Sequence, residues 1–200
     1  MAKVKIPRKS TAIDMTAMCD VAFLLLTFFM LTTKFKPDEP VLVDTPSSIS
    51  EIKLPETDIL MLTIDKEGRV FFGIDGQYTR LKLLDRISER YSITFDDKEK
   101  KTFSVLSNFG VPVQNLKQFL DMLPDERNKV KQPGIPCDSL KNELGDWVLF
   151  ARQSNPKFRI AVKGDRDTHY PVVKQVIATL QEKKVNKFNF ITSMETNPEE

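Results

Sequence analysis

The chain has 200 residues, 40% of them hydrophobic, and a net charge of +2, which suits one membrane anchor and one modest folded domain. The near-neutral charge argues against a nucleic-acid partner, because such proteins carry a large basic field. Two cysteines exclude a disulfide framework. We expect Cys19 and Cys137 to be ordinary thiols, with a Cys137–Cys137 cross-link between two copies as the minor alternative.

Residues 1–13 hold several cations and no acid, directly before an apolar run: Lys3, Lys5, Arg8 and Lys9. Lys34 and Lys36 follow the run, with two acids close behind. The positive-inside rule therefore predicts a cytoplasmic N-terminus and an external remainder. A cleaved signal peptide is the alternative, but the run is too long and no small-residue cleavage site follows it.

Residues 14–34 are predicted to form a transmembrane helix. From Met15 to Thr33 the helix would be about 28 Å long, enough for a bilayer's hydrocarbon core. Asp20 lies within it. The large apolar side chains favour insertion by about 2.4–4.8 kcal/mol together, whereas a central aspartate costs about 2.5–3.5 kcal/mol. Insertion alone is therefore marginal, and Asp20 is predicted to face other protein or water.

Thr16 and Thr27 stand four residues before and seven residues after Asp20, so the three form one polar stripe on a helix. We interpret Asp20 as part of an ion pathway. The alternative is an aspartate near the membrane interface that snorkels to water or caps the start of the helix.

Residues 35–57 are rich in proline and serine, which predicts an extended linker that reaches up to about 60 Å. The linker either lets the domain act at a distance from the membrane or is an ordinary spacer.

A folded domain is predicted over residues 58–192. Two strands come first, separated by a tight turn at Gly68, and a helix follows; a strand, a helix and a last strand come near the C-terminus. The expected ranges are 58–65, 69–73, 79–91, 157–163, 172–180 and 187–192. This β-β-α…β-α-β order predicts a small α+β domain with helices on one face of the sheet.

Residues 92–156 form an insertion that is predicted to be folded and mainly helical, because hydrophobic residues recur throughout it. It contains a charged cluster at 98–101, helices at 113–122 and 140–153, and a turn at 133–136. The insertion either binds a partner or stabilises the domain as a cap. Residues 193–200 are interpreted as a solvated acidic tail.

The only histidine, His169, alternates with Asp165 and Asp167, as in some metal sites. A loop of acids and Thr168 before a proline is more typical of a helix start, where short polar side chains accept free N–H groups. We therefore predict no metal. No nucleophile motif or glycine-rich phosphate loop is present, so neither an enzyme nor a cofactor is expected.

The run from Asp14 to Leu31, DMTAMCDVAFLLLTFFML, resembles the signature of the ExbD/TolR family, the single-span subunits of bacterial proton-driven envelope motors. Asp14, Thr16 and Asp20 match the family pattern, and Ala17 stands where the family usually has proline. More loosely, the resemblance covers residues 58–91 and 157–192, where IAVKGD, Tyr170, a helix and FNFIT follow the family's order.

The resemblance implies an inner-membrane subunit with a periplasmic domain and with protons as coupling ion at Asp20. Its implied partners are a second copy, a pentamer of an ExbB-like multispan protein, and a TonB-like protein that serves outer-membrane transporters. The linker could also pair as a strand with a partner in one state and lie free in another. Two alternatives remain: a TolR-like role in envelope integrity, with peptidoglycan as a possible ligand, and a passive membrane-anchored scaffold that binds cell wall or a partner.

Overall fold

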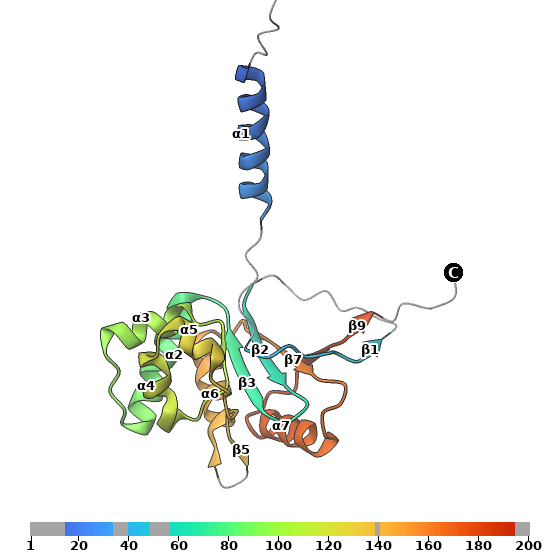
Figure 1. Cartoon of the computed structure of the whole chain (residues 1–200). Coiled ribbons are helices and arrows are strands. Elements are labelled where there is room, and N and C mark those ends of the chain that lie inside the picture. Colours follow the sequence, from blue (N-terminus) through green and yellow to red (C-terminus); the bar gives the residue numbers. More distant parts are fainter. Residues whose placement is uncertain (1–14, 34–39, 49–56, 139–140, 195–200) are drawn as a thin grey trace, which may run out of the picture. The chain divides into compact units, whose positions relative to one another are not determined.

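The computed structural model describes residues 15–33, 40–48, 57–138 and 141–194 (Figure 1). The chain divides into two compact units, Met1–Pro37 and Asp38–Glu200, which we describe separately. The described part of the first unit is helix α1 (Met15–Thr32), which agrees closely with the predicted span. None of its residues is buried.

The second unit is built on a five-stranded sheet. Strands β2 (Ile59–Ile64) and β3 (Val70–Ile74) form an antiparallel hairpin with Leu62 opposite Phe72, and Gly68 turns the chain between them at a φ of 79°. Strand β7 (Arg159–Gly164) runs parallel to β2, and β8 (Phe188–Ile191) runs parallel to β7. With β4 (Asn108–Phe109) at the edge beside β3, the order across the sheet is β4, β3, β2, β7 and β8.

One face of this sheet is covered by three helices, α2 (Gln77–Tyr91), α6 (Glu143–Ser154) and α7 (Tyr170–Glu182). Alternate strand residues point toward these helices and are fully buried with them, as the period of two in a strand requires. The buried strand residues include Leu60, Leu62, Ile64, Phe72, Ile160 and Val162. The predicted β-β-α…β-α-β order, with helices on one face, is thus confirmed.

The insertion is mainly helical, as predicted, and its core is continuous with that of the sheet. Around Trp147, the rings of Phe72 and Phe109 lie at centroid distances of 5.7 and 4.9 Å, and Phe103 packs beside them. Besides β4 and α6, the insertion contributes α3 (Asp97–Val105), α4 (Val113–Asp121), α5 (Pro124–Lys129) and the hairpin of β5 (Cys137–Asp138) and β6 (Lys141–Asn142).

Helix α3 occupies the stretch that the sequence indicated only as a charged cluster. Its first turn is closed by a capping box, in which the Glu99 carboxylate accepts the backbone N–H of Asp96 at 2.6 Å. The predicted helices at 113–122 and 140–153 correspond to α4 and α6, and α6 begins three residues later than expected.

Residues 40–48 differ from the expected free linker, because they lie against the domain. The carbonyl oxygen of Asp44 accepts the backbone N–H of Arg166 at 2.8 Å. Strand β1 (Ser47–Ser48) then pairs in parallel with β9 (Ser193–Met194), at the start of the predicted acidic tail (Figure 1). Residues 35–39 and 49–56 of the predicted linker lie outside the described residues, as do residues 1–13 and the rest of the predicted tail.

Candidate functional site: a carboxylate on an apolar helix

Helix α1 forms readily because it has neither proline nor glycine and consists mostly of apolar side chains. At about 1.5 Å per residue, its 18 residues extend about 27 Å, close to the thickness of a hydrocarbon core. It is the one described helix that is long and apolar enough to cross a membrane. Its length and composition support the predicted anchor.

Asp20 is the single side chain of α1 that would carry a charge in water near neutral pH. It is exposed, and no described group of this chain pairs with its carboxylate. It lies about 8 Å along the axis from Met15 and about 18 Å from Thr32, at 1.5 Å per residue. A carboxylate at such a position in lipid requires water or a partner that the described residues of α1 do not supply.

The two threonines of the predicted stripe lie within about 40° of Asp20 around the helix axis, at about 100° per residue. The Thr27 hydroxyl is within 2.9 Å of the Phe23 carbonyl oxygen and 3.0 Å of that of Leu24, to which it donates. Thr27 therefore satisfies its own donor inside the helix, and its hydroxyl oxygen remains able to accept a hydrogen bond. The Asp20 carboxylate makes no equivalent hydrogen bond within the described residues of α1.

Another side of α1 carries small and medium apolar residues. Ala17, Met18, Val21, Ala22 and Leu25 line a shallow open hollow there, centred about 130° around the helix axis from Asp20 at about 100° per residue. The helix thus has a polar stripe around Asp20 and an apolar face on another side. This division is typical of a helix whose two sides meet different surroundings.

Among the described residues, which include the loop around His169, no group of three or more His, Cys, Asp or Glu side chains is placed to hold a metal ion. Helix α7 does begin after His169, as predicted, but no side chain caps it. The prediction of side-chain capping is therefore wrong. The Asp165 carboxylate instead accepts the backbone N–H groups of Asp167 at 3.0 Å and Asp44 at 3.2 Å.

Both cysteines are free thiols in this chain, as expected: Cys19 is exposed on α1 and Cys137 is half-buried in the hairpin. Burial raises the pKa of the Cys137 thiol, and the negative charge of Asp138 adds to the effect. A raised pKa disfavours the reactive thiolate, so Cys137 has no features of a nucleophile.

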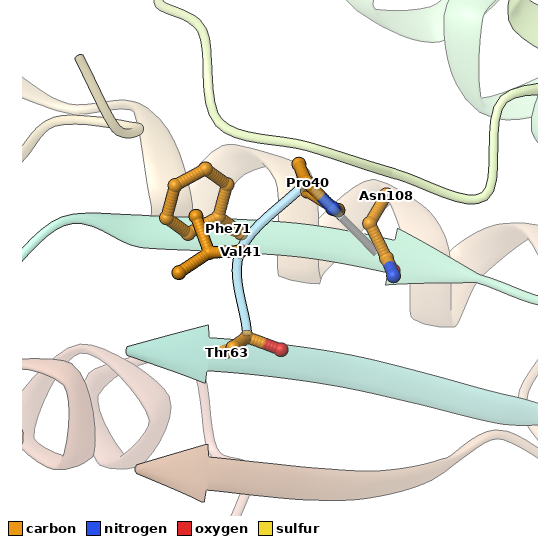
Figure 2. Close-up of a pocket in the computed structure, with 5 residues that line it drawn as sticks. All are labelled: Pro40, Val41, Thr63, Phe71 and Asn108. Atoms are coloured by element: carbon orange, nitrogen blue, oxygen red, sulfur yellow. The ribbon is translucent and has the colours of Figure 1, made fainter. Parts of the chain in front are cut away.

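Sequence reasoning missed one group of residues, on the sheet face opposite the helices. Phe71 and Thr63 lie there beneath Pro40 and Val41, beside Asn108 of the insertion (Figure 2). The available signal was the glycine in the strand sequence VFFGI, because a glycine inside a strand often marks a close approach of another group.

The family model described as biopolymer transport protein ExbD/TolR matches residues 7–195, nearly the whole chain. Comparison with curated proteins finds no match, and neither does comparison with solved structures. The match spans α1, residues 40–48, the sheet and the insertion. The chain therefore belongs to the ExbD/TolR family of biopolymer transport proteins.

Proposed function

We propose that this chain is the proton-carrying subunit of an inner-membrane motor that energises transport across the outer membrane. The observation that carries the proposal is the single carboxylate on an otherwise apolar helix of membrane-spanning length. Membership of the biopolymer transport family supports the energising role. The N-terminus lies in the cytoplasm and residues 40–200 in the periplasm, in accord with the cations before α1.

Asp20 acts by changing charge. In its neutral form the helix tolerates an apolar environment, whereas in its charged form Asp20 requires water or a polar partner. When Asp20 gains a proton from one side of the membrane and loses it to the other, the preferred surroundings of α1 alternate. The two protonation states thereby favour two arrangements of the helix, which is the requirement for coupling proton flow to movement.

The energy scale is sufficient. One proton that crosses a potential of 100 mV releases about 2.3 kcal/mol, enough to change the ratio of two conformations roughly fiftyfold. Thr16 and Thr27, on the same side of α1, provide further polar groups along the path of the proton. No enzymatic step or bound cofactor is needed.

The partner that surrounds Asp20 is a multispan ExbB-like protein, arranged as a pentamer around two copies of α1. Asp20 needs protein or water near it, and no hydrogen bond or ion pair joins its carboxylate to another described residue of α1. The periplasmic domain then passes movement to a TonB-like protein. A TolR-like role would use the same chemistry at Asp20 with a different client, and copurification from membranes distinguishes the two by the client that is recovered.

The test is replacement of Asp20 by asparagine, which preserves shape but cannot ionise. We expect Asp20→Asn to abolish energised uptake in cells, while the variant still copurifies with its multispan partner. Cys19→Ser, one residue away, is the matched control and should retain uptake. Uptake at the normal rate by a fully assembled Asp20→Asn complex would refute the proton role and favour the passive scaffold.

A further inference from the structure

We propose that the insertion holds the linker in place, because its strand β4 forms one wall of a seat that keeps Pro40 and Val41 against the sheet. Holding residues 40–48 there shortens the free chain between the anchor and the domain. The seat thus sets how far the domain reaches from the membrane. The inference requires α1 to be a membrane anchor but does not depend on proton transfer at Asp20.

The seat is built on the sheet face that carries no helix. Pro40, Val41, Thr63, Phe71 and Asn108 enclose a small cavity of about 10 Å³, too small for anything larger than a water molecule. Figure 2 shows Val41 against the Phe71 ring and Pro40 beside Asn108. Phe71 is only 1% exposed, although it lies on the sheet face opposite α2, α6 and α7. A large aromatic ring is therefore buried partly by the linker itself.

Two glycines permit this close packing, one on the sheet and one in the insertion. A Cβ atom at Gly73 of β3 would lie 1.7 Å from the Asn108 side-chain oxygen, so Asn108 lies across the strand where a side chain is missing. A Cβ atom at Gly110 would lie 2.4 Å from the Phe71 ring. Both contacts join the sheet to the insertion, and both shape the seat.

The insertion wall is fixed in position by its own hydrogen bonds. Strand β4 pairs with β3, with Asn108 opposite Gly73. The Gly110 N–H donates to the Gln132 side chain at 2.6 Å, and its carbonyl oxygen accepts the Gly134 N–H at 2.7 Å. Asn108 is therefore presented to Pro40 from a rigid backbone.

The other end of the segment is attached at separate points. Asp44 receives a hydrogen bond from the Arg166 N–H and donates its own N–H to Asp165, and β1 pairs with β9. The described segment thus binds the domain at its beginning, its middle and its end. Leu42, between these attachments, is 86% exposed and contributes little to them.

The effect on reach follows from chain length. At about 3.5 Å per residue, the chain from Thr33 to Pro40 spans at most about 25 Å, whereas the chain from Thr33 to Asp58 spans at most about 85 Å. Docking of residues 40–48 therefore removes about two thirds of the maximum reach. Release of the seat would let the domain act much farther from the membrane.

Hydrogen exchange of the full chain in lipid nanodiscs tests the proposal. We expect Val41→Asp to speed exchange of the amides of residues 41–45 and of Arg166 about tenfold, because a carboxylate cannot be buried against Phe71. Leu42→Asp adds the same charge at an exposed neighbour and should change exchange less than about twofold. Asn108→Ala should speed exchange of the amides of residues 41–45 by several-fold if the insertion forms the wall.

A thiol at position 63 gives a second readout that does not depend on exchange. In a chain whose native cysteines are replaced by alanine, Thr63→Cys should label slowly, and the addition of Val41→Asp should make it label rapidly. Unchanged exchange and labelling in Val41→Asp would overturn the docked segment. If amide exchange in Asn108→Ala matched that of the parent chain while Val41→Asp released residues 40–48, the role of the insertion would be overturned. Loss of uptake in Asp20→Asn has no bearing on either result.

Discussion

Helix α1 exposes its apolar side chains, whereas the domain that follows it buries most of its own. Every residue of α1 is exposed, including a run of leucines and phenylalanines, and its one carboxylate has no described partner. The domain buries its large side chains, among them Trp147 and Phe72, and pairs most of its buried polar groups. The apolar side chains of the helix are thus available to lipid and to other proteins, whereas those of the domain pack mainly against one another.

This difference predicts which property a substitution in each part will change. Substitutions in α1 should alter assembly and coupling without altering the folding of the domain. Substitutions in the domain core should unfold the sheet and the insertion together, because one aromatic cluster joins them. Stability measurements on substituted chains can therefore test this difference between α1 and the domain at several positions.

Trp147→Ala has the largest expected effect. The indole, on α6 of the insertion, is fully buried against the sheet, so its removal should lower the free energy of unfolding by about 3–5 kcal/mol. Thermal unfolding followed by circular dichroism measures the loss, and a single transition for sheet and insertion is expected. Phe190→Ala, at a 44% exposed position on β8, should cost far less. Two separate transitions would mean that the insertion is an independent domain.

Gly73→Ala should have the next largest effect. The new methyl group would lie 1.7 Å from the Asn108 oxygen and 2.8 Å from the Ser107 carbonyl oxygen, so β4 must shift. We expect a loss of about 1–3 kcal/mol in denaturant unfolding. Gly164→Ala is the matched control, because nothing lies within 4 Å of its added methyl group, and its effect should stay within about 0.5 kcal/mol. Equal effects of the two substitutions would contradict the close contact at Gly73.

The sequence was sufficient to predict the frame of the domain, because its strands and helices carry strong periodic signals. Leu62 and Ile64 alternate along a strand, and Leu84 and Ile87 repeat at helical spacing. The turn at Gly68 and the apolar span of α1 were equally plain. These features depend on neighbouring residues, which is the information that a single sequence contains.

The missed features depend on contacts between distant residues. Helix α3 contains one large buried apolar side chain, Phe103, so no periodicity was visible; its capping box of Asp96 and Glu99 was the usable signal. The docking of residues 40–48 was hidden by prolines and serines, since composition says nothing of Phe71 or Asn108 across the sheet. The partner of Asp20 cannot be read from this chain at all.

Tyr91→Phe tests a polar link between α2 and the insertion. The Tyr91 hydroxyl donates to the Asp146 carboxylate at 3.0 Å, and burial, followed by the charge of Asp146, raises the pKa of the tyrosine. As the pH rises, the unfolded chain therefore loses the phenolic proton before the folded chain does. The stability that the Tyr91 hydroxyl contributes is fully present below pH about 10 and is lost as the pH rises further. Tyr91→Phe should cost about 1 kcal/mol at neutral pH.

The alkaline part of the profile distinguishes this link from simple packing. Between pH about 9 and 11, the free energy of unfolding should fall less steeply in Tyr91→Phe than in the parent chain, because the variant has no proton to lose at this site. Tyr78→Phe, at a 70% exposed position, is the control and should follow the parent profile. Parallel profiles for Tyr91→Phe and the parent would show that the bond to Asp146 does not perturb the tyrosine.

The smallest expected effect is that of Asp20→Asn on the stability of the domain. Asp20 belongs to one compact unit and the domain to the other, so the domain's melting temperature in nanodiscs should shift by less than about 1 °C. The same variant is expected to abolish energised uptake. A large loss of stability would mean that Asp20 supports the fold, and its effect on uptake could then no longer be assigned to proton transfer. An unchanged melting temperature beside lost uptake would place the defect in the membrane, where we propose that the carboxylate acts.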